Sequence, residues 1–440
     1  MAYSGNFLIR CLLLVALLGS IFIVYFTFTQ NKQDTIRKFH LARHLKFNLA
    51  VVMKNESEAE RFTTGTHPVQ NELPTVSSPF ALTDDDEYSV QIFYYPWYGN
   101  PKFDHGKYYH WNHRFLSHWD PTVVDQYPRG VHSPPSDIGS SFYPLLGPYS
   151  SRNPAVIEQH MKWMSSAGID VVIVSWFPPR TSDEQGYPWD DLIPVLLDAV
   201  AKYRMKLSFH MEPYKERSGE SLRNDIEYII DNYGNHSAFY KVKRKLRKRL
   251  LVKSEDRYSL LAAGFDGIYT YFAAKGFSYG STPSNWPSLS SFCRKNNLIF
   301  IPSVGPGYDD HRVRPWNKMN YNDRMNGKYY ADMFEMAHVA RANIITITSF
   351  NEWHEGTQIE PAISFTDNST GFVYNTYAQG PEQYLHQTLD LIKKKHFGCF
   401  MCKEICLLEK NSTGTKTFRF EKKKPDITLP RRAEALPPIL

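Results

Sequence analysis

Apolar runs of strand length alternate with segments of helical periodicity between about residue 88 and residue 395 of this 440-residue chain. Each run is followed by a loop, and helical patterning is clearest at Val156–Met164 and Leu192–Tyr203. Strands that alternate with helices are typical of a parallel sheet whose faces are covered. Six strand-like runs are recognisable: Val90–Tyr95, Ile169–Trp176, Leu207–Glu212, Gly267–Phe272, Leu298–Val304 and Ile344–Phe350.

Polar and aromatic residues gather at the carboxyl ends of these runs, which is the layout of the mouth of a (β/α)8 barrel. Such a barrel needs eight strands, and the count falls short between Tyr240 and Asp266. One short strand fits Leu250–Val252. The predicted fold class is therefore α/β, a TIM-type barrel with one or two βα units missing between residues 240 and 266.

The last strand-like run is followed by Ser349–Glu360, which contains two carboxylates three residues apart, Glu352 and Glu355. Two carboxyl groups beside aromatic surface can cut a glycosidic bond, one as an acid and the other as a base or nucleophile. The alternative is a helix N-terminus whose dipole favours acidic residues, and Glu360 fits that alternative. For Glu352 and Glu355 we favour catalysis.

Composition supports a sugar cleft more than a nucleic-acid surface. Aromatic residues make up 15% of the chain, with 28 Tyr and 9 Trp, and sugars stack on such rings, although a large core also uses them. The net charge is +6, but Lys241–Lys253 carries eight positive charges and no acidic residue, so the remainder is −2. We expect no nucleic-acid partner; the alternative for the run itself is a polyanion-binding insert.

The N-terminal region predicts a membrane anchor. Residues 11–28 are apolar and uncharged, near the lower limit for a bilayer span. The alternative is a signal peptide, but its apolar core is normally shorter and no clear cleavage site follows, so we expect an uncleaved signal-anchor. Residues 1–10 precede it, and residues 29–87 follow it as a polar stem. Positive charges after the span, such as Arg37 and Lys38, favour the opposite orientation. Sequons favour a luminal chain, with acceptors at Asn55, Asn235, Asn368 and Asn411.

The pattern decays after residue 395, and residues 396–440 are expected to be a flexible tail. Three of its residues form a C-x-x-C-x-x-x-C cluster, Cys399, Cys402 and Cys406, while Cys293 stands alone. A zinc site would need a fourth ligand and none is spaced to supply it. We expect one disulfide with a spare thiol, or unpaired cysteines, and no metal or cofactor.

Several long strings, in one order from about Ile92 to Glu360, resemble the Golgi endo-α-1,2-mannosidase family, glycoside hydrolase family 99, whose enzymes and endomannosidase-like paralogues they do not separate. The strings are Phe93–Asn100, Gly139–Pro144, Phe209–Tyr214, Gly264–Phe272, Pro302–Tyr308 and Asn351–Glu360. The resemblance implies a (β/α)8 barrel on a type II anchor in the Golgi membrane, with the catalytic domain in the lumen. Residues 1–10 would then be a cytoplasmic tail and residues 29–87 a luminal stem. It also implies release of glucosylated mannose from glucosylated high-mannose N-glycans.

The resemblance implies a retaining mechanism through a 1,2-anhydro sugar. Glu352 would be the base that deprotonates the mannose 2-hydroxyl, and Glu355 the acid that protonates the leaving oxygen and then activates water. It further implies sugar contacts from Tyr95, Trp97, Tyr98, His210, Tyr271 and Asn351, with Trp176 and Phe177 shaping the donor-side pocket. The alternatives are ordinary barrel packing for the aromatic residues and a structural pair with Glu212 for His210.

The chain departs from the family where the strand count fails, because the segment between Tyr240 and Gly264 is shorter and holds the Lys/Arg run. A lost barrel strand leaves unpaired edges. The alternative function is therefore a catalytically impaired isoform or a non-catalytic luminal glycan-binding protein.

Overall fold

The computed structural model describes residues 49–52, 88–241, 249–252 and 265–394. The expected cytoplasmic tail, the expected span over 11–28, the tail over 396–440 and most of the expected stem lie outside these ranges. Within the described ranges, no helix is long and apolar enough to cross a membrane.

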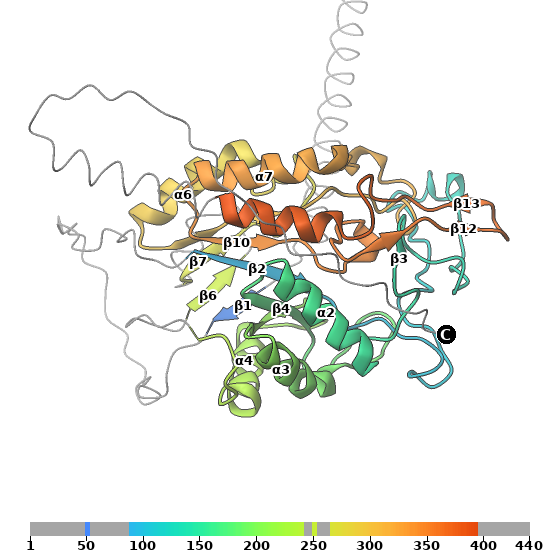
Figure 1. Ribbon diagram of the computed structural model, residues 1–440. Helices are drawn as coiled ribbons and strands as arrows, with labels where there is room; N and C mark the ends of the chain where they lie inside the picture. Colours follow the sequence, from blue (N-terminus) through green and yellow to red (C-terminus); the bar gives the residue numbers. More distant parts are fainter. Residues whose placement is uncertain (1–48, 53–87, 242–248, 253–264, 395–440) are drawn as a thin grey trace, which may run out of the picture. The chain divides into compact units, whose positions relative to one another are not determined.

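A nine-stranded sheet forms the centre of the fold, in the order β8-β7-β6-β1-β5-β4-β2-β10-β9 (Figure 1). Its strands are β1 (Leu49–Val52), β2 (Ser89–Tyr94), β4 (Val171–Trp176), β5 (Lys206–Met211), β6 (Arg249–Val252), β7 (Gly267–Tyr269), β8 (Ile299–Ile301), β9 (Ser303–Val304) and β10 (Ile344–Ile347). All six strand-like runs of the sequence are found among them. β2 and β5 have the expected length and begin one residue earlier, and the other strands are shorter than expected.

The sheet closes on itself because β8 and β9 are two parts of one chain segment, separated only by Pro302. β8 pairs in parallel with β7, and β9 pairs in parallel with β10. The Pro302 carbonyl accepts a hydrogen bond from the backbone N–H of Thr346 at 3.0 Å. The ring therefore has eight strand positions, which confirms the TIM-type barrel.

The two positions missing from the sequence count are filled by β6 and β1. β6 contains Leu250–Val252, where one short strand was expected. β1 lies in the range expected to be a stem without a core, and no strand was predicted there. It pairs antiparallel with both neighbours, Ala50 lying opposite His210 of β5 and Leu251 of β6.

The start of β5 has a different neighbour. Leu207 forms a parallel bridge with Phe239, and its carbonyl accepts from the Tyr240 N–H at 2.9 Å. A parallel strand thus begins beside β5 at Phe239, and β1 takes over the pairing from Phe209 onward.

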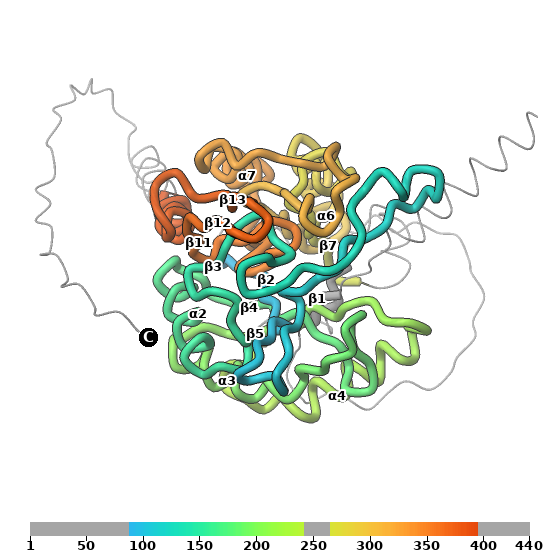
Figure 2. Tube along the Cα trace, turned by 90° about the vertical axis from the view of Figure 1, so that its right-hand side faces the viewer, coloured from blue at the N-terminus to red at the C-terminus, as the bar shows by residue number. Residues whose placement is uncertain are grey.

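Helices flank the strands on both sides (Figures 1 and 2). They are α2 (Pro154–Ser166), α3 (Ile193–Lys202), α4 (Gly219–Tyr233), α6 (Trp286–Lys295) and α7 (Lys328–Val339), followed by a helix that begins at residue 383. Polar residues set two of the starts: the Asn153 side chain accepts from the Ala155 N–H, and Ser218 and Ser221 form a capping box. The smaller strand pairs are β3 (Tyr143–Pro144) with β11 (Ala362–Ile363) and β12 (Thr366–Asp367) with β13 (Phe372–Val373).

Alternation along the strands sorts side chains between the barrel interior and the helix layer. Phe93, His210 and Tyr269 come from three strands, and their rings lie within 5.0–6.0 Å of one another, so they fill the interior. The next residue of β2, Tyr94, instead contacts His160 of α2. Successive residues of a strand therefore point alternately into the barrel and toward the surrounding helices.

Candidate active site

The turn after β10 carries both predicted catalytic carboxylates. It is closed by backbone hydrogen bonds from Ser349 N–H to the Thr357 carbonyl and from Ile359 N–H to the Ser349 carbonyl. Gly356 adopts a φ of +59°, and a Cβ there would lie 2.6 Å from the Asp309 carbonyl oxygen, so the turn requires glycine at that position.

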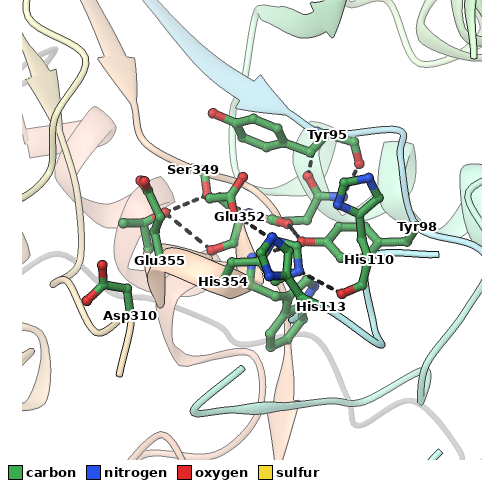
Figure 3. Close-up of polar contacts among 12 residues, drawn as sticks. Tyr95, Tyr98, His110, His113, Asp310, Ser349, Glu352, His354 and Glu355 are labelled. Atoms are coloured by element: carbon green, nitrogen blue, oxygen red, sulfur yellow. Dashed lines mark hydrogen bonds and ion pairs between the residues drawn. The ribbon is translucent and has the colours of Figure 1, made fainter. Parts of the chain in front are cut away.

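Glu352 and Glu355 differ in their surroundings (Figure 3). Glu352 is 4% exposed, its backbone N–H donates to Ser349 Oγ at 2.7 Å, and one carboxyl oxygen lies 3.4 Å from His354 Nδ1. The Glu355 side chain is 12% exposed and lies 3.6 Å from Arg314 Nη1. One carboxylate therefore faces an imidazole and the other a guanidinium, which gives them different proton-transfer properties.

Arg314 is shared between Glu355 and a buried acid. Its Nη1 lies 3.1 Å from Asp310, which also accepts from the Tyr308 hydroxyl at 2.9 Å. Burial works to lower the pKa of Arg314, but Tyr308, Glu355 and Asp310 together raise it above its ordinary value. Burial raises the pKa of Asp310, against the effect of Arg314. Arg314 is thus a permanent cation beside Glu355.

Two tyrosines, Tyr95 after β2 and Tyr271 after β7, lie close to the turn that carries the carboxylates: Asn351 bonds the Tyr95 backbone, and Thr348 Oγ1 donates to the Tyr271 carbonyl. The hydroxyl groups of Tyr95 and Tyr271 are in hydrogen-bond contact. Burial raises the pKa of Tyr271 well above its ordinary value, and the charges of Glu355 and Glu352 raise it further. The pKa of Tyr95 is likewise raised by burial, and Glu352 contributes. The charges of both glutamates thus act on one phenol, that of Tyr271.

Trp97 and Tyr98 complete the aromatic wall after β2. The Trp97 ring stacks on His110 with a centroid distance of 4.5 Å and an interplanar angle of 8°. The Tyr98 hydroxyl donates to the Asn351 carbonyl at 3.0 Å and accepts from the Trp353 N–H at 3.1 Å. Tyr98 is thus fastened to the glutamate-bearing turn, while Trp97 is half-buried.

Asn351 and His210 lie deeper than sugar contacts usually do, and both are fully buried. The Asn351 amide bonds both backbone groups of Tyr95. The His210 ring lies 5.2 Å from the Tyr271 ring, and its Nε2 is 3.7 Å from Glu212. The structure therefore shows Asn351 holding the loop and His210 beneath the mouth beside Glu212; direct sugar contact by either stays a prediction.

Trp176 lies on the helix-facing side of β4. It is fully buried, its ring contacts Phe209 and Tyr228 of α4, and its Nε1–H donates to Asp190 at 2.6 Å. The adjacent Ser175 instead bonds Glu212 at 3.0 Å. The predicted role of Trp176 in the donor-side pocket is therefore not supported by this geometry.

Phe177 is half-buried at the end of the same strand, with its ring edge-on to Trp189 at 5.6 Å. It is positioned at the barrel mouth, and its predicted role in shaping the donor-side pocket stays a prediction.

Glu360 closes a buried network under the turn. It is fully buried, and its carboxylate accepts from Tyr149 at 2.7 Å and Trp353 Nε1 at 3.0 Å, with His160 Nε2 at 3.1 Å. Glu360 does not serve as a first-turn acid of a helix, as the sequence suggested; it anchors the turn to α2.

A set of histidines beside Glu352 was missed by the sequence analysis. His110 and His113 follow β2, His354 lies between the two glutamates, and their acidic partners Asp183 and Glu184 follow β4. Arg314 and Tyr308 were also missed as neighbours of Glu355. The only sequence signal was that each follows a strand end, a property shared with many loop residues.

Two of the four sequons can be placed. Asn235 and Asn368 are exposed in turns, as glycosylation requires, and Asn55 and Asn411 lie outside the described residues. Cys293 is buried in α6, and Cys399, Cys402 and Cys406 lie outside the described residues.

Comparison with known proteins gives one consistent family. The model of glycosyl hydrolase family 99 matches residues 85–248 and 245–396. The two matched segments meet inside the Lys/Arg run, where the sequence departs from the family motifs.

Curated relatives and a solved structure agree with this match. The chain is 49% identical over 342 residues to a glycoprotein endo-alpha-1,2-mannosidase of Rattus norvegicus, covering 68% of this chain and 73% of that protein. It is 46% identical over 314 residues to a human glycoprotein endo-alpha-1,2-mannosidase-like protein, covering 62% and 68%. A GH99 endo-alpha-mannosidase structure from Bacteroides thetaiotaomicron aligns with a TM-score of 0.63 at 37% identity, covering 70% of this chain and 97% of that one. The chain therefore belongs to glycosyl hydrolase family 99, a family of glycoside hydrolases.

Proposed function

We propose that the chain is a retaining endo-α-1,2-mannosidase that releases glucosylated mannose from glucosylated high-mannose N-glycans. The observation that carries the proposal is the pair of carboxylates on the turn after β10, with Glu352 3.4 Å from His354 Nδ1 and Glu355 3.6 Å from Arg314 Nη1. The names of the relatives support the linkage, and the aromatic wall supplies surfaces on which pyranose rings stack.

The proposed first step uses neighbouring-group attack instead of an enzyme nucleophile. Glu352 takes the proton of the mannose 2-hydroxyl, O2 bonds to C1, and the C1–O bond to the next sugar breaks. The leaving oxygen keeps the electron pair and receives a proton from Glu355. The product is a 1,2-anhydro sugar, with C1 inverted once.

The second step reverses both proton transfers. Glu355, now a carboxylate beside Arg314, takes a proton from water; the water oxygen bonds to C1 as the C1–O2 bond breaks, and O2 recovers its proton from Glu352. C1 is inverted twice in total, so the anomeric configuration is retained. Arg314 supports this exchange because its charge favours the carboxylate that Glu355 becomes after donation.

The test is a glycan-release assay on the segment 29–440, with products identified by mass and the anomer of the released sugar by NMR. Release of a glucosylated mannose in the α-configuration supports the proposal. Soluble, cooperatively folded protein that releases nothing favours the alternative of a non-catalytic glycan-binding protein. Cleavage with inversion would exclude the anhydro-sugar route.

We also propose that the chain is a type II protein of the Golgi membrane with its barrel in the lumen. The apolar residues 11–28 and the exposed sequon residues Asn235 and Asn368 support this. A mass shift on deglycosylation supports this orientation if it is lost when all four sequon asparagines, including Asn235 and Asn368, are replaced by Gln. Cleavage of the barrel by protease added outside sealed vesicles would contradict it.

A further inference from the structure

An imidazole lies against the proposed general base. His354 is buried on the turn between the two glutamates, with Nδ1 3.4 Å from a carboxyl oxygen of Glu352 and Nε2 2.8 Å from the His110 carbonyl oxygen. Figure 3 shows the ring between Glu352 and His110.

The partners of the two ring nitrogens fix where the proton is. A carbonyl oxygen only accepts, so Nε2 of His354 must carry the hydrogen of its bond to His110. In the neutral ring Nδ1 then has a lone pair, and that lone pair faces Glu352. Two acceptors at 3.4 Å form no hydrogen bond unless a proton lies between them.

A second imidazole, that of His113, disfavours protonation of His354 at Nδ1. The His113 ring lies 4.6 Å from the His354 ring, with Nδ1 2.8 Å from the Arg114 carbonyl and Nε2 3.3 Å from Glu184. Both nitrogens of His113 thus face acceptor oxygens.

The remaining groups that face His354 are His110, 5.6 Å away and paired with Asp183, and the Tyr98 ring at 5.8 Å. Burial, followed by the charges of His113 and His110, holds the pKa of His354 well below its ordinary value, and Glu184 offsets this only in part. This shift favours the neutral ring of His354, in which Nδ1 is an acceptor.

We infer that His354 is a positioning residue that strengthens Glu352 as a base, by facing the carboxylate with a lone pair and offering the protonated carboxyl a hydrogen-bond acceptor. The inference rests on the proposed function, in which Glu352 must take a proton from a hydroxyl group. A hydroxyl is a far weaker acid than a carboxyl group, so a base with greater proton affinity speeds the transfer.

Two substitutions test the contacts of Nε2 and of Nδ1 separately. His354→Gln keeps an N–H that can reach the His110 carbonyl and removes the acceptor beside Glu352. His354→Asn keeps a polar group near the Nδ1 position and supplies an N–H that can donate to the carboxylate. The exposed His236, paired with Asp198, gives the control His236→Gln.

The readout is the acidic limb of the pH profile of kcat/KM. We expect the limb to move to lower pH by about one unit in His354→Gln and further in His354→Asn, because the carboxylate is stabilised in that order. We expect kcat to fall about 10- to 100-fold, with KM nearly unchanged. An activated leaving group should not restore turnover in either variant, because the affected step is at O2.

A second measurement does not need turnover. Carbon-13 NMR of protein labelled at the glutamate side-chain carboxyl, with Glu352→Gln to assign the signal, follows the protonation of Glu352 directly. We expect Glu352 to take up its proton at higher pH in the unsubstituted protein than in either variant.

If neither the acidic limb of the kcat/KM profile nor the NMR titration of Glu352 shifts in either variant, the inference is overturned and His354 is a packing residue. Shifts to higher pH would also overturn it, because they require His354 to be an imidazolium. If the unsubstituted protein releases no glycan, the proposed function fails, and the NMR titration alone decides the role of His354.

Discussion

The side-chain amide of Asn351 spans the backbone of Tyr95: its Oδ1 accepts from the Tyr95 N–H at 2.8 Å, and its Nδ2 donates to the Tyr95 carbonyl at 2.9 Å. The two residues are 256 positions apart, so this pair joins the loop after β2 to the turn after β10. The aromatic wall and the glutamates thereby keep a fixed separation.

We expect Asn351→Ala to lower the free energy of unfolding by about 2–4 kcal/mol, because it leaves two buried backbone groups without partners. We expect turnover to fall about 100-fold, since a displacement of about 1 Å at the site is that costly. Urea unfolding and the glycan-release assay measure the two effects. The control is Asn232→Ala, an exposed helix residue; equal losses in both variants would contradict the pairing.

Substrates with different leaving groups distinguish the roles of the two glutamates. Glu352→Gln and Glu355→Gln should each lower turnover of the natural glycan at least about 100-fold. A substrate with an activated leaving group should restore much of the turnover of Glu355→Gln, because its oxygen needs no proton, and none of that of Glu352→Gln. Equal rescue of both variants would reverse or remove the role assignment.

Substitution of the buried Glu360 should destabilise the protein far more than substitution of an acid in an exposed ion pair. Glu360→Ala removes the acceptor of His160 and Tyr149 and leaves Trp353 Nε1 only its longer contact with the Tyr149 hydroxyl at 3.3 Å. We expect the free energy of unfolding to fall by about 3–5 kcal/mol. The control is Glu382→Ala, whose pair with His386 is exposed and should contribute under about 1 kcal/mol. Denaturant melts of both variants decide the point.

Stability should fall as the pH falls below 6.5. Burial lowers the pKa values of both His354 and His132 from their ordinary 6.5 in the folded chain. Between the folded and unfolded pKa values the unfolded chain binds more protons, so each group removes up to about 1.4 kcal/mol of stability per pH unit. Urea melts at pH 7, 6 and 5 measure this slope.

The same series run on His354→Gln should give a shallower slope than the unsubstituted protein, and His236→Gln should leave it unchanged. A slope that does not respond to His354→Gln would mean that this ring takes up its proton normally in the folded chain.

The position of β1 predicts an effect of truncation. A segment beginning at residue 46 keeps β1, and one beginning at residue 54 lacks it, which leaves β5 and β6 unpaired along one edge each. With about 1 kcal/mol per lost hydrogen bond, we expect the shorter segment to melt about 5–10 °C lower. Equal melting temperatures would show that β1 does not stabilise the barrel.

The sequence by itself determined the alternation of strands and helices, the turn with two carboxylates and the family. These are carried by local periodicity and by contiguous strings of residues. It left open which face of each strand points inward, because strands buried on both faces, such as β4, show no polar side. The resemblance assigned Trp176 to the pocket, and only the structure shows that its ring contacts Tyr228 of α4 while the adjacent Ser175 bonds Glu212.

Only the tertiary structure decided which distant residues meet. β1 lies about 160 residues before its partner β5, and nothing in its four residues names that partner. The histidines around Glu352 come from two loops, after β2 and β10, and their acidic partners Asp183 and Glu184 come from the loop after β4. Which hydrogen-bond partners each ring has is decided by how these three loops meet at the barrel mouth. A single chain's local pattern records periodicity and residue type, but the neighbours across a closed barrel are set by packing of the whole fold.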